Sequence, residues 1–332
     1  MSNQEQFIKY VRTKQFFKQR LRGEEHDTHQ SVHISSEEIE KRFFPYPKYN
    51  RKAELQKLEQ SGHLKIDTTE QYHTYRALLP GGIDISLLPG KNKNYSPGIK
   101  QMRDHLLKVS LPTGAESTPY FDLFLKHRKN YIDYFFTVDD FASRVHTPVS
   151  GLKNKIRANL LLDEEPTTSF DVAQMQPILL GKVLEEKIGE NEFTTWINEG
   201  RDIYIMLQDK AGLKDRSEAK DRFYEMTFGI PDHALERIFG AAPWIRWINN
   251  YKSHKQPGNP SEKIYSNLAW LMQTTEVQTM RKIWKLLINA GIIFCTVHDE
   301  IIVKEEDSTQ ALEAMNTVLS QSFARYKINA KK

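Results

Sequence analysis

Apolar and polar positions form their clearest patterns in the C-terminal half of the chain. Residues 292–303 hold two apolar runs on either side of the charged triplet 298–300, which predicts two buried strands joined as a tight β-hairpin. Residues 169–173 predict the end of another strand, and an amphipathic helix is expected to begin at Pro177. The two strand ends would each present carboxylates, which makes them the first places to look for chemistry.

The N-terminal part predicts a small module of helices and strands. Residues 35–43 begin with a serine cap and residues 50–64 with an asparagine cap, so both predict helices. Two short strand-like runs follow around a polar turn at 65–79. This is the order of a winged-helix DNA-binding unit, whose basic second helix would enter a major groove while the ribbon touches phosphates. An ordinary small α+β module explains the same pattern.

Three stretches rich in turn-forming residues interrupt these patterns. Residues 78–98 hold most of the local glycine and proline and predict a linker after the N-terminal module. Residues 163–169 predict a turn, and residues 253–263 predict an exposed loop.

Composition narrows the class of protein. Of 332 residues, 39% are hydrophobic, and the mean hydropathy is −0.61, which is typical of a globular protein with a polar surface. We find no apolar run of the roughly 18–20 residues that a membrane helix needs, and we expect a cytoplasmic protein of bacterial, phage or mobile-element origin. The single cysteine, Cys295, excludes a disulfide scaffold and a zinc site with several thiolates. No GxxxxGK[ST] loop is present, which argues against an ATPase or helicase.

The net charge of +4 makes the protein mildly basic. The positions of the charged residues are more informative about a binding partner than the net charge is. Lysine and arginine gather in four stretches, at 9–22, 51–57, 91–108 and 126–157, with aromatic residues among them. This pattern favours a nucleic-acid partner, although solvated helix faces would produce it as well.

Two segments carry carboxylates that could bind a metal ion. Asp171 stands at a predicted strand end, where it is either a metal ligand or a plain helix cap. Asp299 and Glu300 follow His298 at the predicted hairpin tip. Adjacent acids between buried strands are costly unless a cation compensates them, so a divalent metal is favoured over a solvated turn.

A third segment carries cations. Arg216 and Lys220 share one face of a predicted helix with Tyr224 and Phe228, and Gly229 is its expected end. Two cations followed by aromatics suit a triphosphate and the base or sugar attached to it. An amphipathic helix with a solvated basic edge is the alternative.

The order of these three segments resembles motifs A, B and C of family A DNA polymerases, the DNA polymerase I type. Motif A would span 171–178, motif B would run from Arg216 to Gly229, and motif C would be 298–300. Two weaker similarities support the match. Residues 143–145 resemble the family's Gly-Arg-Leu segment, and Met272-Gln273 resembles its Met-Gln-Gly-Thr segment. The resemblance covers about residues 130–325.

The resemblance implies an α+β fold of the right-hand type, with an antiparallel palm sheet, helical fingers and a mainly helical, thumb-like or winged-helix N-terminal region. The expected divisions are 1–125 for the DNA-gripping region, 126–185 for the first palm segment, 186–261 for the fingers and 262–332 for the second palm segment. The region before the palm is too short for an exonuclease plus a thumb, so we expect no proofreading.

The resemblance also implies roles for single residues. Asp171 and Asp299 would hold two Mg²⁺ ions, for which Mn²⁺ can substitute, and Glu300 would support them. Lys220 would bind the triphosphate and protonate pyrophosphate. Arg216 would bind the outer phosphates, Tyr224 would pack near the sugar, and Phe228 would pack near the base or template. Three further residues would hold the primer terminus and the duplex: Arg144, Gln273 and His298.

The chain departs from the family pattern at the sugar. Gln176 replaces the motif A glutamate that blocks a 2′-hydroxyl, and Ile178 replaces the terminal arginine of motif A. Phe228 stands where the family has the tyrosine that hydrogen-bonds this glutamate, and it has no hydroxyl to form that bond. We therefore expect weaker exclusion of ribonucleotides, although Tyr224 and Glu300 are typical of deoxynucleotide polymerases. The sequence predicts a template-directed DNA polymerase that binds primer–template DNA and dNTPs. The alternatives are a ribonucleotide-tolerant or primer-making relative and an inactive DNA-binding accessory protein.

Overall fold

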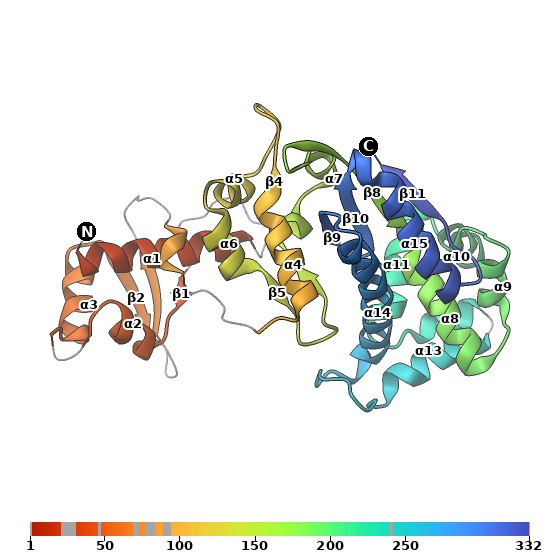
Figure 1. Cartoon of the computed structure of the whole chain (residues 1–332). Coiled ribbons are helices and arrows are strands. Elements are labelled where there is room, and N and C mark those ends of the chain that lie inside the picture. The colour runs from red at the N-terminus through yellow and green to blue at the C-terminus, as the bar shows by residue number, and fades with distance from the viewer. Residues whose placement is uncertain are drawn as a thin grey trace. The chain divides into compact units, whose positions relative to one another are not determined.

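The computed structural model describes residues 2–20, 31–45, 48–68, 73–77, 84–88, 94–239 and 242–331. The chain divides into two compact units (Figure 1). The first contains residues 1–93 and 118–134, and the second contains residues 94–117 and 135–332.

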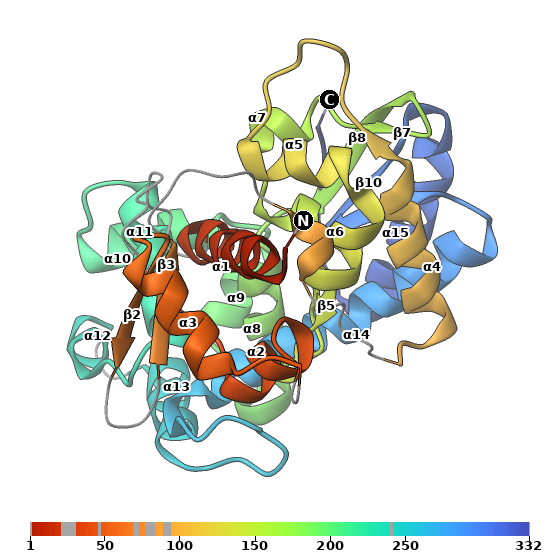
Figure 2. The same cartoon turned by 90° about the vertical axis from the view of Figure 1, so that its left-hand side faces the viewer.

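The first unit contains α-helices and a small antiparallel sheet (Figure 2). Its elements run α1 (Asn3–Arg20), β1 (Val32–His33), α2 (Ser36–Arg42), α3 (Arg51–Gln60), β2 (Leu64–Thr68) and β3 (His73–Ala77), with η1 (Ile85–Leu87) next and α5 (Pro119–Lys126) and α6 (Arg128–Phe135) from the later segment. The sheet order is β1-β3-β2. Its core is aromatic, since Phe7 of α1 makes edge contacts with Phe43, Phe44 and Tyr75.

Both helices expected in this unit are present and capped as the sequence predicts. The Ser35 side chain accepts a hydrogen bond from the Glu38 amide, and the Asn50 side chain accepts one from the Ala53 amide. The ribbon of β2 and β3 is also confirmed, with Leu64 paired to Ala77. Of the predicted linker at 78–98, residues 78–83 and 89–93 lie outside the described residues.

A six-stranded antiparallel sheet is the centre of the second unit. Its strands are β4 (Val109–Ser110), β7 (Leu161–Leu162), β8 (Glu165–Val172), β9 (Phe294–Val297), β10 (Glu300–Lys304) and β11 (Ile328–Lys331), and a separate ribbon joins β5 (Thr137–Val138) to β6 (Val145–His146). The strand β8 is shared most widely, because it pairs with β7, β10 and β11. Asp171 therefore sits in a strand that is hydrogen-bonded to segments from distant parts of the sequence.

Helices make up most of the rest of the second unit. They are α4 (Pro97–His105), α7 (Asn154–Arg157), α8 (Met175–Ile188), α9 (Glu192–Asn198), α10 (Ile203–Ala211), α11 (Arg216–Phe228), α12 (His233–Ile238), α13 (Pro243–Ser253), α14 (Asn267–Asn289) and α15 (Ser308–Ser322), with the short turns η2 (Leu106–Lys108), η3 (Pro148–Gly151), η4 (Ile264–Ser266) and η5 (Glu305–Asp307). The long α14 packs against α8, α11, α13 and α15. A cluster of Phe193, Trp196, Phe239 and Trp244 fills the space between the shorter helices.

The hairpin and the basic helix predicted from the sequence are confirmed. β9 and β10 pair with Val297 opposite Glu300, so His298 and Asp299 form a two-residue turn. α11 ends at Phe228 with Gly229 as its cap. The loop at 253–263 is also present between α13 and η4.

Two boundaries were predicted wrongly. The helix after Asp171 begins at Met175 rather than Pro177, because Gln174 takes a left-handed backbone conformation (φ 55°) and starts the helix there. Asp171 is therefore not a helix cap. The turn expected over 163–169 contains only Asp163 and Glu164, both at positive φ, which is typical of a tight hairpin; β8 begins at the next residue.

The division expected at residue 125 also differs from the observed one. Residues 118–134 belong to the first unit, where the Tyr120 ring lies 4.5 Å from that of Phe16. Residues 94–117 belong to the second unit, where Val109 of β4 pairs with Leu162 of β7. Local helix and turn signals cannot reveal such exchanges, because they depend on pairing between distant segments.

The coarse class, α+β with antiparallel sheets, is confirmed. The right-hand arrangement of palm and fingers stays a prediction. None of the described helices is both long and apolar enough to cross a membrane.

Candidate active site

One pocket of the second unit collects most of the predicted catalytic and nucleotide-binding residues. It has a volume of about 590 Å³. Six of the predicted residues line it: Asp171, Gln176, Arg216, Lys220, Tyr224 and Asp299. They come from β8, α8, α11 and the β9–β10 turn, which lie up to 128 positions apart in the sequence. The three segments singled out by their chemistry therefore meet at one place.

Asp171 forms part of the floor of the pocket. It pairs across the strands with Asn329 of β11. Its Oδ1 atom is buried and has no hydrogen-bond partner among the described residues, although Lys331 Nζ lies 3.2 Å away. The Lys331 ammonium therefore compensates this carboxylate through an ion pair, and a metal ion bound at Asp171 would share the carboxylate with Lys331 or displace it.

A second carboxylate of the pocket, Asp299, lies in the hairpin turn. Burial raises the pKa of this carboxyl to about 7, and the nearby charges of Glu276, Asp171 and Glu300 act in the same direction. The preceding His298 has a positive φ of 58°. The carboxyl group in this turn is therefore harder to ionise than a solvent-exposed aspartate, and a nearby positive charge would favour its ionised form.

The two carboxylates fit a hard divalent cation that keeps part of its water shell. Mg²⁺ prefers oxygen ligands and is commonly held by one or two carboxylates together with substrate phosphates. Over the described ranges, no group of three or more acidic, histidine or cysteine side chains is arranged to hold a metal by itself. Asp171 and Asp299 would accordingly bind such ions together with a phosphate ligand.

Two cations of α11 stand on another side of the pocket. The Arg216 guanidinium is held by Asp202, with a hydrogen bond of 2.9 Å from its Nε, and lies 4.9 Å from the centre of the Tyr204 ring. Lys220 Nζ lies 5.9 Å from the Tyr224 ring and makes no ion pair with a described residue. Arg216 is thus positioned before any ligand binds, whereas Lys220 is available to one.

Aromatic residues form the wall beside these cations. Tyr204 and Tyr224 both line the pocket, and burial raises the pKa of both phenols. Tyr224 stacks on Phe228 with ring centres 5.6 Å apart. Phe228 does not line the pocket itself, so its direct contact with a base is not seen and its visible effect is to orient Tyr224.

A buried polar network lies behind Gln176. Its amide nitrogen donates to Glu276 of α14, and Arg144 Nη2 donates to the other carboxylate oxygen at 2.8 Å. The Glu276 side chain is only 2% exposed, and burial raises the pKa of its carboxyl while Arg144 opposes that effect. Gln176, which stands where the family has a glutamate, therefore lies beside a carboxylate from another helix, that of Glu276.

Four further predicted residues lie outside the pocket lining. Glu300 is buried and paired with Arg157 at 2.9 Å, and Arg144 is committed to Glu276. The surrounding protein, with Arg144, His146 and Arg157, lowers the pKa of His298 to about 4, so its ring is neutral near pH 7. Gln273 is partly exposed on α14.

Sequence reasoning missed several residues of this site. Tyr204, Asp202, Gln174, Lys327 and Asn329 line the pocket, and Glu276 supports it from behind. In the sequence Asp202 is recognisable only as the N-cap of a helix, and its additional contact with Arg216 cannot be predicted from that. The others belong to no motif, and the pairing of β11 with β8 brings Lys327 and Asn329 to the pocket. A scan against protein-family models and a search of curated proteins find no match to this chain.

Proposed function

We propose that the chain is a template-directed DNA polymerase that adds deoxynucleotides to a primer 3′ end. One observation carries the proposal: Asp171 and Asp299 line the same pocket as Arg216 and Lys220. A pair of carboxylates beside two cationic side chains suits a magnesium-bound triphosphate. The carboxylates would bind the magnesium ions, and the cationic side chains would bind the phosphates.

The reaction would proceed by direct displacement. The primer 3′-oxygen forms a bond to the α-phosphorus and loses its proton to solvent, while the bond from the α-phosphorus to the bridging oxygen breaks and pyrophosphate leaves. When bound at Asp171 and Asp299, two Mg²⁺ ions, or Mn²⁺, supply neutralisation of the developing charge. Lys220 would donate a proton to the departing pyrophosphate, and Arg216, fixed by Asp202 and Tyr204, would hold the outer phosphates.

The sugar would lie against Tyr224, with Gln176 below it. Gln176 donates to Glu276 and Phe228 has no hydroxyl, so the hydrogen bond that the family uses against a 2′-hydroxyl does not form. This arrangement supports a polymerase that prefers dNTPs and tolerates rNTPs. A primer-making relative is the second candidate, and the same pair of residues favours it.

The first unit would grip the duplex. Its order α1-β1-α2-α3-β2-β3, with the sheet order β1-β3-β2, is that of a winged helix, which supports this interpretation over a thumb. The unit has 19 lysine and arginine residues against 14 acids, whereas the second unit has 28 against 29. The excess positive charge of the chain therefore lies in the part proposed to hold phosphates.

Primer extension tests the proposal. Wild type is compared with Asp171→Ala and Asp299→Ala on a primed DNA template with Mg²⁺, in separate dNTP and rNTP reactions. Asp307→Ala is the matched control, because Asp307 lies in η5, outside the pocket. We expect extension by wild type and control, and its loss in both pocket variants. Tight DNA binding without extension in wild type would instead indicate an inactive accessory protein.

A further inference from the structure

A second pocket adjoins the proposed catalytic pocket. Its volume is about 370 Å³. The two pockets share Ala173, Gln174, Gly200 and Lys327 in their linings. A small molecule that leaves the triphosphate-binding side could therefore pass from one pocket to the other along a wall they have in common.

The second pocket is strongly cationic. Arg201, Arg325 and Lys327 line it, and no acidic side chain of the described residues does. Arg201 is paired with Glu199, whereas Arg325 and Lys327 have no acidic partner within the described part of the chain. Three cations around one cavity without an acid favour an anionic occupant.

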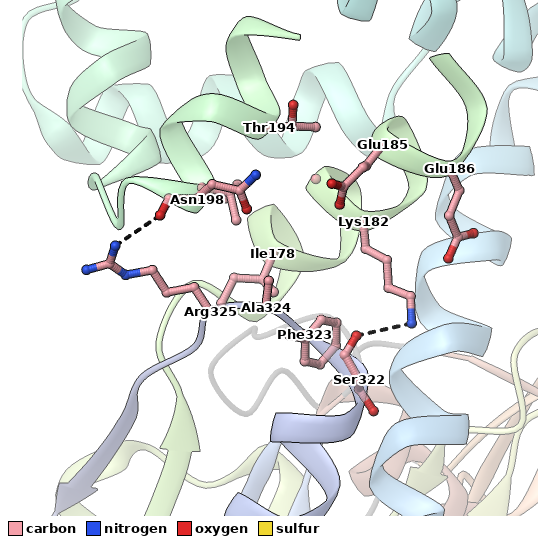
Figure 3. A pocket seen from close by; sticks show the side chains of 12 residues that line it. Ile178, Lys182, Glu185, Glu186, Thr194, Asn198, Ser322, Phe323, Ala324 and Arg325 are labelled. Carbon is pink, nitrogen blue, oxygen red and sulfur yellow. Dashed lines mark hydrogen bonds between the residues drawn. The ribbon is translucent and has the colours of Figure 1, made fainter. Parts of the chain in front are cut away.

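The backbone is shaped to seat one of these cations. Gly200 follows α9 with φ +71°, and a Cβ atom there would lie 2.6 Å from Arg325 Nε. Arg325 Nη1 donates to the Asn198 carbonyl at 2.9 Å, at the C-terminal end of α9 (Figure 3). The guanidinium is thus held in a place that only glycine at position 200 leaves open.

The cationic region is short. A third pocket, of about 240 Å³, shares Ile178, Ile197 and Arg325 with the second. Glu185 and Glu186 line it, and in Figure 3 they lie across this pocket from the Arg325 head group. An extended nucleic-acid strand continuing past Arg325 would meet these two acids, whereas a compact anion would not.

We propose that Arg325 and Lys327 form a second polyphosphate site, which takes up inorganic pyrophosphate as it leaves the catalytic pocket. The site accepts the product because Lys327 borders both pockets and Arg325 lies beyond it. This assignment of the ligand rests on the proposed polymerase function, since only a reaction that consumes nucleoside triphosphates in this way supplies pyrophosphate at that place.

Calorimetric titration of the full chain with inorganic pyrophosphate tests the site directly. We expect wild type to bind it, and Arg325→Ala and Lys327→Ala to weaken the affinity at least about tenfold each, because each removes a charge-assisted contact. Arg325→Lys keeps the charge and should retain most of the affinity. Lys182→Ala is the matched control, because Lys182 lines only the third pocket and should leave binding unchanged.

Several outcomes would overturn the proposal. The first is that folded wild type does not bind pyrophosphate. The second is that the Arg325 and Lys327 variants bind it as wild type does while Lys220→Ala does not, which would place the ligand in the catalytic pocket. The third is that single-stranded DNA displaces pyrophosphate and that Arg325→Ala no longer binds this DNA. The last would assign the pocket to a nucleic-acid strand. Primer extension measured in parallel separates the two proposals. If wild type binds pyrophosphate and the Arg325 and Lys327 variants do not, but wild type shows no extension, the pyrophosphate site is upheld and the polymerase function is refuted.

Discussion

At the residue scale, Asp299 shows how a buried carboxyl can oppose stability at neutral and higher pH. Burial and three neighbouring carboxylates raise its pKa to about 7 in the folded chain, while an unfolded aspartate titrates near 4. The folded state therefore holds this proton more tightly than the unfolded state does. The group favours folding fully at low pH, and that contribution is lost as the pH rises from about 4 to about 7.

The first prediction follows from this sign. Asp299→Asn should raise the melting temperature at pH 8 by about 2–4 °C, the shift that ~1 kcal/mol produces in a domain of this size, and should abolish primer extension. Added Mg²⁺ should stabilise wild type at pH 8 but not the variant. Thermal melts at pH 5 and pH 8 would check this, and a variant that melts below wild type at pH 8 would contradict it.

The second prediction concerns the pair Gln176 and Glu276. Restoring the family residue with Gln176→Glu would place two carboxylates in contact in a buried position, so we expect the melting temperature to fall by about 4–8 °C. The double variant Gln176→Glu/Glu276→Gln exchanges the two groups and should recover most of that loss. An additive effect of the two changes would show that the side chains do not interact.

At the scale of elements, the site depends on how α11, β8 and the hairpin are anchored. Lys252 of α13 is only 1% exposed, and its Nζ donates to the carbonyls of Met226 at 2.7 Å and Ile230 at 3.0 Å. It thereby satisfies carbonyls at the C-terminal end of α11, the helix that carries Arg216 and Lys220. Burial lowers the pKa of this amine to about 8.

The third prediction is that Lys252→Met destabilises the second unit by about 2–4 kcal/mol, because the buried Met226 carbonyl and the Ile230 carbonyl both lose a charged donor. Lys255→Met removes an amine from the loop after α13, where Lys255 also donates to backbone carbonyls, and should cost less than about 1 kcal/mol. Chemical denaturation of both variants makes the comparison. Equal effects would show that burial of Lys252 is irrelevant.

Elements were also the level at which the sequence was most informative. The hairpin around Asp299 and the helix of Arg216 followed from runs and spacings that are local in the sequence. The start of α8 did not, since Gln174 adopts a left-handed conformation that its residue type rarely takes. Lys327 and Asn329 could not be placed either, because their position depends on the pairing of β11 with a strand about 160 positions earlier.

At the scale of the whole molecule, the charge is divided unevenly between the two units. On α3 the buried side chains are Leu55 and Leu58, and the opposite side exposes Lys52, Gln56, Lys57 and Gln60, with Glu59 at its edge. Ammonium and amide groups are the donors that reach phosphates and base edges in a groove. The winged-helix order was predicted from helix caps and strand alternation, but the exchange of residues 118–134 into this unit was not.

The fourth prediction concerns this surface. Binding of the full chain to duplex DNA should weaken steeply with salt, and Lys52→Ala should reduce the slope of log affinity against log salt by about 0.9, the contribution of one phosphate contact. Lys285→Ala, exposed on α14 of the second unit and outside the four basic stretches, is the control and should leave the slope unchanged. Fluorescence anisotropy at several salt concentrations would measure it. Equal slopes for all three proteins would remove α3 from the DNA interface.

The central claim is that Asp171, Asp299, Arg216 and Lys220 form one nucleotidyl-transfer site. A single-turnover assay tests it most directly, by following the addition of one nucleotide to a primer and the release of pyrophosphate in wild type, Asp171→Asn and Lys220→Ala. We predict one pyrophosphate released per nucleotide added by wild type, no addition by Asp171→Asn, and addition slowed at least about 100-fold in Lys220→Ala. Addition at the wild-type rate by Asp171→Asn, or no addition by wild type with Mg²⁺ or Mn²⁺, would contradict the claim.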